Sequence, residues 1–318
     1  VSNEKWWAMD IPDDNLDHKV TAIIKTFERA EKVRNLHASL RQYYPTLPVV
    51  IVDDSQTPMP DIWDSQTRYV HADYDIGLSQ GRNLAVSYVD TPFTLLLDDD
   101  FLFTPKTKIE TFLQILETTD FQIVAGQVLD FGWKNRVFKG MLEVHDTVLY
   151  LNNYHKGMRH QGHIRYDFVL NFFLARTQTL RDNPWDPELK IREHEDFFWR
   201  LKQKNILVTS TKHVSIGHYP TSDTVQKDDL YFEKRVERFH HYHHLACQKI
   251  GVSDFVSLGA MYYHLWFRHM IIWLKFQSLS HHSESLFWRN IHCSFLVWGK
   301  MKGRFPTQSK KSKSNELS

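Results

Sequence analysis

Cysteine, net charge and long apolar runs are all scarce in this sequence of 318 residues. The two cysteines, Cys247 and Cys293, are too few for a disulfide framework, and neither belongs to a Cys-x-x-Cys pair. Lys and Arg (39) almost balance Asp and Glu (38), so the formal charge of +1 does not favour nucleic acid as a partner. The longest uncharged run of the aromatic C-terminal part, residues 255–267, is shorter than the roughly 20 residues that a membrane-spanning helix needs.

A substantial folded core is expected, because 42% of the residues are hydrophobic and the chain is long enough for one large domain or two average ones. From Val20 to about Ser210, short apolar runs alternate with amphipathic stretches, which is typical of a mainly parallel sheet covered by helices. The sequence therefore predicts an α/β fold that binds its ligand at the carboxyl ends of its strands. The clearest predicted elements are the strands Val20–Ile24, Pro48–Val52 and Phe93–Leu97 and the helices Glu31–Gln42 and Leu78–Val89.

Changes in composition predict the domain borders. Trp266 and Phe267 stand beside Arg268 in the aromatic part of the chain, a combination that fits a helix lying at a membrane surface. Packing of this part on the α/β domain explains the same residues equally well, so both alternatives stay open. The predicted divisions are an N-terminal segment (1–18), the α/β domain (19–225), a helical aromatic-rich region (226–305) and a flexible basic tail (306–318).

Three consecutive aspartates, Asp98, Asp99 and Asp100, follow the apolar run Phe93–Leu97. Carboxylates crowded this closely raise one another's pKa unless a cation lies among them. A hard divalent ion such as Mn²⁺ or Mg²⁺, bound by one or two carboxylates together with substrate phosphates, is therefore the expected occupant. The alternative is a solvated acidic turn in which Asp100 caps a helix.

Polar residues from other strand ends are expected to lie close to these aspartates. Residues 26–29 follow the first strand, and Asp53 and Asp54 end the second. Gly77 and Arg82 flank the start of a helix, where backbone N–H groups and a guanidinium can bind a diphosphate. Because the carboxyl ends of parallel strands share one edge of a sheet, the sequence predicts a site for phosphate and metal at that edge.

Four segments of the chain resemble a known enzyme family. They are VTAIIKTFERAEKVRNLHASLRQYYPTLPVVIVDDS, GLSQGRNLAVS, LLLDDDFLFT and DFVLNFFLARTQTLRDNPWDPELKIREHEDFF. In this order and spacing they are similar to glycosyltransferases of the GT-A fold. More narrowly, they resemble the β-1,4-N-acetylgalactosaminyltransferase group that includes GM2/GD2 synthase and Sda synthase. The resemblance implies a Rossmann-like mixed sheet flanked by helices, with a UDP-sugar as co-substrate.

The same resemblance implies roles for individual residues around the nucleotide and the metal. Asp98, Asp99 and Asp100 would form the Asp-x-Asp element, with Asp98 near the ribose and Asp100 on the metal. His218 would complete the metal shell, and Asp54 would hold the uracil ring. The remaining residues of the predicted nucleotide-sugar site are Thr26, Arg29, Gly77 and Arg82.

An inverting transfer needs a base that takes the proton of the acceptor hydroxyl as it attacks the anomeric carbon. Glu193, Glu195 and Asp196 in the segment REHEDFFWR are the candidates. The resemblance places Asp196 at the base position, and Glu195 is the alternative. Both acids could instead simply favour the positive end of the helix that begins there.

Two further sets of residues have possible ligand-binding interpretations. The resemblance implies that Asp167 and Asn171 contact the donor or acceptor sugar. Trp185 can stack on a sugar face, although core packing explains it as well. The histidines of HHYHH, residues 240–244, place two rings on one face of a helix, but no cysteine or carboxylate pattern completes a zinc site there. Zinc is therefore not the expectation at these histidines.

The sequence thus predicts an inverting, metal-dependent hexosyltransferase with Mn²⁺ or Mg²⁺ as cofactor. The expected reaction moves GalNAc from a UDP-sugar to an acceptor glycan or glycolipid. One alternative is transfer of another hexose or N-acetylhexosamine, such as Gal or GlcNAc, because few contacts separate such donors. Another is a non-catalytic glycan-binding or membrane scaffold on a degenerate transferase domain.

The expected compartment follows from differences to the family that the chain resembles. Those animal enzymes are Golgi proteins with an N-terminal membrane anchor, whereas this sequence shows neither an anchor nor an Asn-x-Ser/Thr acceptor. We therefore expect a bacterial-type cytoplasmic enzyme, peripheral to a membrane. The Golgi lumen is the alternative if an N-terminal anchor is missing from this chain.

Overall fold

The structure is a computed structural model, and its description covers residues 16–59, 63–131, 134–136, 139–153, 157–219 and 229–257. In the last of these ranges, side chains are described for residues 238–256. Most of the predicted N-terminal segment, most of the aromatic-rich region and the basic tail therefore lie outside the described residues. No helix within the described ranges is long and apolar enough to cross a membrane.

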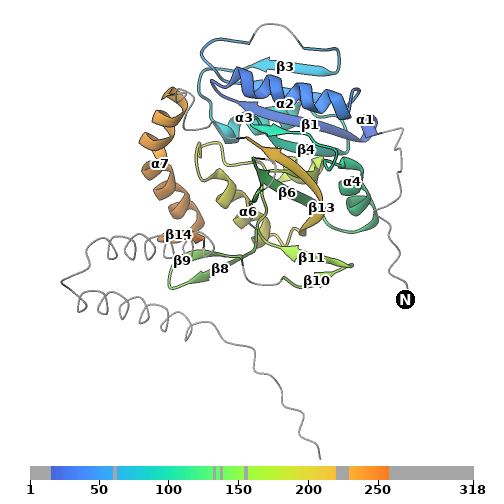
Figure 1. The fold of residues 1–318 in the computed structure, drawn as a ribbon. Helices are drawn as coiled ribbons and strands as arrows, with labels where there is room; N and C mark the ends of the chain where they lie inside the picture. The colour runs from blue at the N-terminus through green and yellow to red at the C-terminus, as the bar shows by residue number, and fades with distance from the viewer. Residues whose placement is uncertain are drawn as a thin grey trace, which may run out of the picture. The chain divides into compact units, whose positions relative to one another are not determined.

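One mixed sheet forms the centre of the described chain (Figure 1). Its strands are β1 (Val20–Thr26), β2 (Val49–Asp53), β3 (Thr67–His71), β4 (Phe93–Asp98), β5 (Phe101–Leu102), β6 (Ile123–Asp130), β7 (Lys134–Asn135), β10 (Arg159–His160), β11 (His163–Tyr166), β12 (Phe173–Arg176) and β13 (Val208–His218). Their order is β10-β11-β13-β6-β12-β4-β1-β2-β3, with β5 paired to β13 and β7 to β6. β1 runs parallel to β2 and β4, whereas β12 is antiparallel to both β4 and β6.

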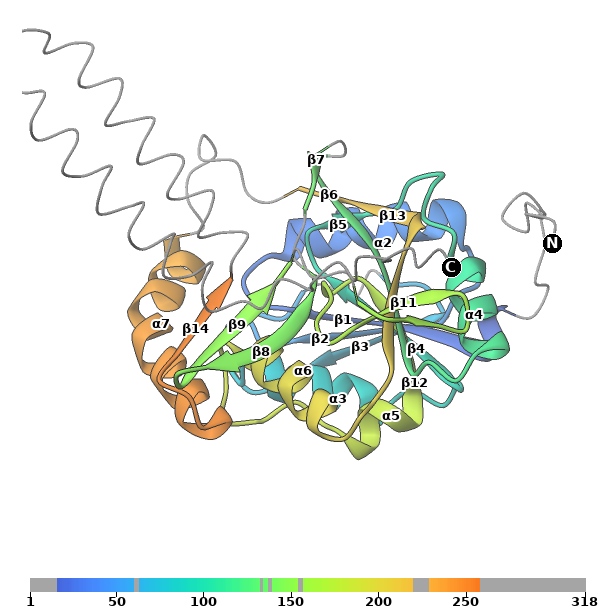
Figure 2. The same ribbon diagram turned by 90° about the horizontal axis from the view of Figure 1, so that it is seen from below.

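Helices cover both faces of this sheet (Figure 2). On α2, Val33, Leu36 and Leu40 recur at helical spacing and are fully buried, so this face of the helix packs on the sheet. The predicted helices and strands match observed elements, and the predicted α/β fold is confirmed. One face carries α1 (Leu16–Lys19), α2 (Ala30–Tyr43) and α4 (Ile109–Thr118), and the other carries α3 (Leu78–Ser87), α5 (Thr177–Asp182) and α6 (Glu193–Gln203).

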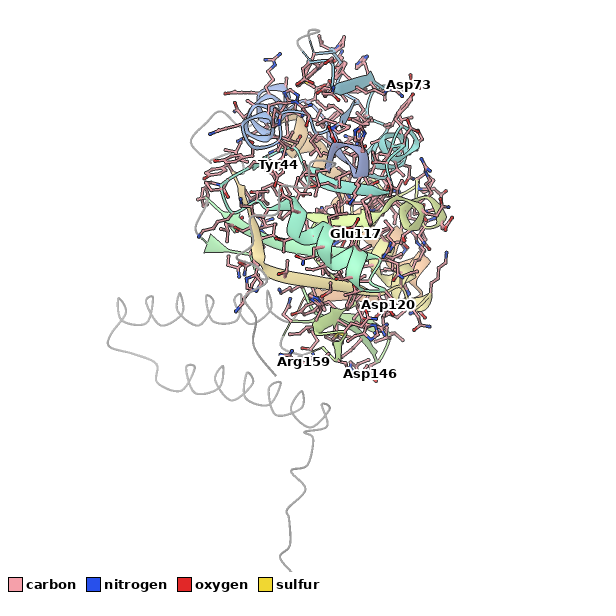
Figure 3. All side chains as sticks on the ribbon, turned by 90° about the vertical axis from the view of Figure 1, so that its right-hand side faces the viewer. Tyr44, Asp73, Glu117, Asp120, Asp146 and Arg159 are labelled. Carbon is pink, nitrogen blue, oxygen red and sulfur yellow. The ribbon has the colours of Figure 1, made fainter. Side chains whose placement is uncertain are left out.

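A smaller three-stranded sheet is assembled from two distant parts of the chain. β8 (Met141–His145) and β9 (Val148–Asn152) form an antiparallel hairpin, and β14 (Asp254–Ser257) pairs with β9 in parallel. In space, the hairpin turn at Asp146 and the loop residue Asp73 after β3 lie at opposite ends of the folded part that the structure describes (Figure 3). Helix α7 (Asp229–Ile250) precedes β14 and packs against α6. The predicted domain border at residue 225 stays a prediction.

The sheet gathers polar residues at one edge. β1, β2 and β4 are parallel neighbours, so their carboxyl ends meet, and the register pairs Thr26 with Asp53 and Lys25 with Asp98. β13 runs parallel to β6 and ends at His218, which pairs with Phe101 of β5. This edge therefore combines residues that are far apart in the sequence.

Candidate active site

A pocket of about 380 Å³ lies at this edge of the sheet. Its walls come from the ends of β1, β4 and β13, from the starts of α3 and α6, and from Arg238 and Phe239 of α7. Acidic groups gather at residues 98–100, and basic groups surround them, so the pocket can bind both a cation and a polyanion. The basic residues that line it are Lys25, Arg29, Arg82, Arg136, Lys190, Arg192 and Arg238.

Arg29 links two of the three consecutive aspartates. Its Nη1 donates to Asp99 Oδ1 at 2.6 Å and its Nη2 to Asp100 Oδ2 at 2.9 Å. Thr26 Oγ1, from the end of β1, donates to the other oxygen of Asp99 at 2.8 Å. Burial raises the pKa of Asp99 to about 6, against the opposing charge of Arg29. Thr26 itself lies behind the pocket lining, where it orients Asp99.

His218, at the end of β13, lies beside Asp100. The distance from His218 Nε2 to Asp100 Oδ2 is 3.4 Å, and His218 Nδ1 lies 2.6 Å from Asp130 Oδ1. Burial opposes ionisation of Asp100, but the hydrogen bonds and charges of His218 and Arg29 hold its pKa below the ordinary value. Burial also acts to lower the pKa of His218, yet the nearby carboxylates raise it. The oxygen and the ring nitrogen are thus placed to share one divalent cation.

Arg82 connects Asp98, the first of the three consecutive aspartates, to helix α6. Its Nη2 donates to Asp98 Oδ1 at 3.1 Å and its Nη1 to Glu193 Oε1 at 2.8 Å. Asn171 Nδ2 donates to the second oxygen of Asp98 at 3.2 Å. All of these side chains line the pocket, so the structure brings the predicted residues Arg82, Asp98 and Asn171 together there.

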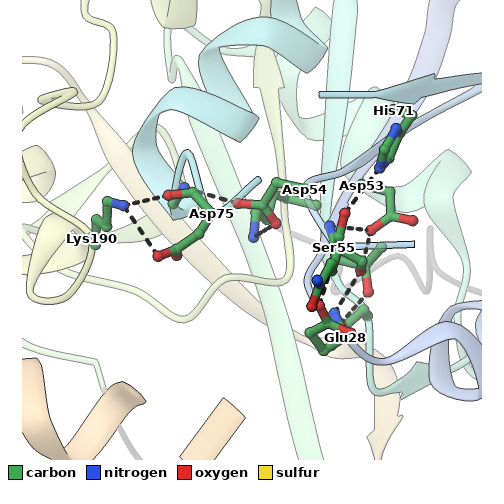
Figure 4. Close-up of polar contacts among 12 residues, drawn as sticks. Glu28, Asp53, Asp54, Ser55, His71, Asp75 and Lys190 are labelled. Atoms are coloured by element: carbon green, nitrogen blue, oxygen red, sulfur yellow. Dashed lines mark hydrogen bonds and ion pairs between the residues drawn. The ribbon is translucent and has the colours of Figure 1, made fainter. Parts of the chain in front are cut away.

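Asp54 supports the pocket from behind. It is fully buried, its Oδ1 accepts a hydrogen bond from Lys25 Nζ at 2.5 Å, and its Oδ2 accepts one from the backbone N–H of Gly77 at 2.9 Å. Figure 4 shows Asp75 between Asp54 and Lys190, both of which it contacts. Burial lowers the pKa of Lys25, although the Asp54 carboxylate partly offsets this effect. The structure therefore places Lys25 and Gly77 at the pocket surface and Asp54 beneath them.

The acidic residues at the start of α6 point to different places. Glu193 and Glu195 line the pocket, and Glu195 Oε1 accepts a hydrogen bond from Arg192 Nη1 at 2.5 Å. Asp196 lies outside the pocket lining, is 2% exposed, and pairs with Arg200 one turn later at 2.8 Å. Successive helical residues point in different directions, so neighbours in the sequence need not face the same site. The structure brings Glu195 to the pocket and leaves Asp196 away from it.

Two residues predicted to contact a sugar lie away from the pocket. Asp167 is 4% exposed and accepts hydrogen bonds from Lys202 Nζ at 2.8 Å and the backbone N–H of Leu142 at 3.1 Å. Trp185 is fully buried, and its ring stacks on Phe197 with the centroids 4.6 Å apart. Asp167 thus links α6 to β8. Trp185 is part of the core beneath the guanidinium of Arg82, so its position fits the core-packing alternative.

Sequence reasoning missed several residues that line the pocket. Arg238 and Phe239 come from α7, and no local motif marks them as pocket residues. Arg238 pairs with Asp75 at 2.6 Å, and the Arg192 guanidinium lies 4.9 Å from the centroid of the Phe239 ring. The position of Lys25 was predictable, because it directly precedes the predicted site residue Thr26 at the end of β1.

Sequence comparisons identify similar proteins. The family model described as "Glycosyl transferase family 2" matches residues 21–183, just over half of the chain. Beta-1,4 N-acetylgalactosaminyltransferase 1 of Mus musculus is 36% identical over 192 residues, which are 58% of this chain and 36% of that protein. Beta-1,4 N-acetylgalactosaminyltransferase 2 of Mus musculus is 35% identical over 219 residues, which are 65% of this chain and 40% of that protein. The chain thus spans less than half the length of these curated relatives.

Solved structures of one bacterial protein also resemble this chain. The structure of S. aureus TarS 1-349 matches with a TM-score of 0.48 and 15% identity, over 73% of this chain and 65% of that chain. The structure of the same TarS piece in complex with UDP-GlcNAc matches with a TM-score of 0.49 and 14% identity, over 66% of this chain and 60% of that chain.

Proposed function

The chain belongs to glycosyltransferase family 2, and we propose that it is an inverting, metal-dependent enzyme that transfers a sugar from a UDP-sugar to an acceptor glycan or glycolipid. The observation that carries the proposal is the 3.4 Å distance between Asp100 Oδ2 and His218 Nε2 at a pocket rich in guanidinium groups. These two atoms can take neighbouring positions around one divalent ion, with phosphate oxygens completing the shell. When bound, such an ion offsets the charge that develops on the leaving diphosphate.

Side chains around this pair are proposed to orient the nucleotide sugar. Asp98 presents its carboxylate to the pocket between Arg82 and Asn171, where it can accept hydrogen bonds from ribose hydroxyls. The N-terminal end of α3 at Gly77 and the guanidinium of Arg82 attract phosphate. Thr26 and Asp54 act indirectly, because they hold Asp99 and Lys25 from behind the pocket wall.

Glu195 is the proposed catalytic base. Its carboxylate lines the pocket in the first turn of α6, where it can meet an acceptor hydroxyl and take its proton. Arg192 holds one of its oxygens. Asp196, the base that the resemblance implies, forms an ion pair with Arg200 outside the pocket. It is the alternative catalytic base.

GalNAc is the proposed donor sugar. Its support is the 35–36% identity to proteins named as β-1,4 N-acetylgalactosaminyltransferases over 58–65% of this chain. Transfer of GlcNAc or Gal is the alternative, because a few contacts decide between such donors.

The test is metal-dependent release of UDP from a panel of UDP-sugars, with and without glycan and glycolipid acceptors. We expect release that prefers UDP-GalNAc, needs Mn²⁺ or Mg²⁺, and falls at least about 100-fold in Asp100→Asn. Asp120→Asn is the matched control, because this side chain is 53% exposed and pairs with His160 away from the pocket. Release that resists a chelator would overturn the metal requirement, and a folded protein that binds no UDP would overturn the nucleotide-sugar assignment.

Contact with a membrane surface at the cytoplasmic face is a further part of the proposal. Its support is compositional, because residues 258–305 combine many Trp and Phe residues with Arg and Lys. A glycolipid or lipid-linked acceptor would be found at such a surface.

A further inference from the structure

The chain makes a tight turn directly after the C-terminal end of α7 at Ile250. The backbone N–H groups of Gly251 and Val252 both donate to the carbonyl oxygen of Cys247, each at 2.9 Å. Gly251 has a φ of +82°, which a residue without a Cβ adopts without strain. After the turn, Asp254 at the start of β14 lies beside His243 of the helix.

Three side chains with metal-binding chemistry meet at this turn. His243 and Cys247 stand one helical turn apart on α7, and Asp254 approaches from β14. His243 Nε2 lies 2.9 Å from Asp254 Oδ1 and 3.8 Å from Cys247 Sγ, and one donor atom from each residue lies within 4.8 Å of the others. These separations are close to those between ligands that surround a single small ion at bonds of about 2.0–2.3 Å.

The geometry excludes a nucleophile relay of the Cys–His–Asp type. In such a relay, the thiol and the carboxylate face different ring nitrogens, so that the histidine can pass a proton between them. Here Cys247 and Asp254 both approach Nε2 of His243. Three donors that converge on one point describe a coordination site instead.

We propose that His243, Cys247 and Asp254 bind one Zn²⁺ ion, with water in the fourth position. Thiolate and imidazole ligands select zinc over the hard ions expected at Asp100. Cys247 is 4% exposed, whereas the Asp254 side chain is 54% exposed, so the site is closed on the helix side and open to water on the strand side. In the absence of metal, burial and the Asp254 carboxylate raise the pKa of the Cys247 thiol, and zinc deprotonates a coordinating thiol.

The ion would join β14 to α7, which lines the pocket through Arg238 and Phe239. Phe239 on α7 and Phe255, next to Asp254, both lie against the guanidinium of Arg192. The guanidinium carbon is 4.9 Å from the centroid of the Phe239 ring and 5.5 Å from that of Phe255. Arg192 in turn holds Glu195. A zinc ion at this turn therefore stabilises the wall of the pocket and is separate from the predicted metal at Asp100.

Metal binding by the full-length chain tests the proposal. Cys293→Ser serves as the parent protein, so that Cys247 is the one remaining thiol. After treatment with a chelator, the protein is titrated with Zn²⁺ and with Co²⁺, and bound metal and the absorption spectrum are recorded. We expect about one Zn²⁺ per chain at this site and a thiolate-to-Co²⁺ charge-transfer band, together with a rise in Tm on zinc binding.

Single substitutions in this parent assign the ligands. Cys247→Ser, a near-isosteric change, should abolish the charge-transfer band, and Asp254→Ala should weaken Zn²⁺ binding. His241→Ala is the matched control, because His241 is exposed on the same helix and does not belong to the group. The proposal is overturned if the folded parent shows no thiolate band, or if His241→Ala weakens binding as much as His243→Ala. If Cys247→Ser does not fold, Asp254→Ala still tests the proposal, because unchanged Zn²⁺ binding by Asp254→Ala contradicts a site with three protein ligands.

Discussion

At the scale of single residues, two adjacent carboxylates of α6 have different surroundings. Glu195 lines the pocket beside Arg192, whereas Asp196 is buried against Arg200 outside it. We expect Glu195→Gln to lower kcat by at least about 100-fold while UDP binding is kept, because a general base contributes roughly 10²–10⁴-fold. Turnover and UDP affinity are measured on the same preparation.

Asp196→Asn is the matched variant one position away. It removes one partner of an ion pair whose aspartate is 2% exposed, so we expect a loss of about 1–3 kcal/mol in the free energy of unfolding, with kcat changed only a few-fold. Urea denaturation and steady-state kinetics separate the two effects. If Asp196→Asn loses turnover and Glu195→Gln keeps it, the base is Asp196 and our choice is wrong.

His194 gives a prediction about pH. Burial lowers its pKa to about 3, and the charge of Arg82 acts in the same direction, so the native ring stays neutral where an unfolded histidine binds a proton. Between about pH 6.5 and pH 3 the unfolded chain therefore holds the extra proton, and the free energy of unfolding falls as pH falls through this window. From pH 7 to pH 5 this residue should account for up to about 2 kcal/mol.

His194→Gln tests this origin of the pH dependence. The glutamine amide can replace the ring N–H that faces the carbonyl oxygen of Val169 at 2.7 Å, but it does not titrate. Urea unfolding of both proteins at pH 7 and pH 5 should show a smaller drop for the variant. Equal drops in the two proteins would rule out His194 as the source.

At the scale of elements, the start of α3 depends on Gly77. Its φ is +90°, and an added Cβ would lie 2.6 Å from Cγ of Lys190. Gly162, in the turn between β10 and β11, has a φ of +83°, and an added Cβ there meets no atom within 4 Å. We expect Gly162→Ala to cost about 1–2 kcal/mol in the free energy of unfolding from backbone strain alone.

Gly77→Ala should cost about 1–3 kcal/mol more than this control, because a steric clash with Lys190 is added to the backbone strain of a φ and ψ (+90°, 173°) that essentially only glycine adopts. It should also weaken UDP binding, since the backbone N–H of Gly77 is held by Asp54 at the pocket wall. Urea denaturation and UDP titration measure both effects. Equal losses in the two variants would show that the contact with Lys190 adjusts without cost.

At the scale of the whole molecule, membrane contact predicts a loss of binding when aromatic residues are removed. The triple variant Trp266→Ala, Phe267→Ala and Trp273→Ala should weaken flotation with anionic vesicles by at least about tenfold, because each ring contributes about 1.5–3 kcal/mol when it leaves water. Trp6→Ala with Trp7→Ala is the aromatic control from the other end of the sequence. Unchanged flotation of the triple variant would remove these residues from the membrane contact.

Much of the whole-molecule organisation was predictable from sequence. The predicted strand Val20–Ile24 lies within β1, the predicted helix Glu31–Gln42 lies within α2, and the resemblance to GT-A glycosyltransferases is confirmed by the family match and by 35–36% identity to the N-acetylgalactosaminyltransferases. Buried strands and amphipathic helices carry their pattern locally, so periodicity reveals them. The predicted gathering of Arg29, Asp98 and His218 at one pocket also agrees with the geometry.

The sequence alone predicted where the first strands and helices lie along the chain and which polar residues follow the strands, because each strand and its terminal acids are neighbours in the chain. Tertiary structure decided which acids face the pocket, since the direction of Glu195 and Asp196 depends on how α6 packs on the sheet. It also brought Asp254 to the helix residues His243 and Cys247, a convergence that depends on the turn at Gly251 and on the pairing of β14 with β9. Contacts between separate elements are set by packing, and no local pattern encodes them.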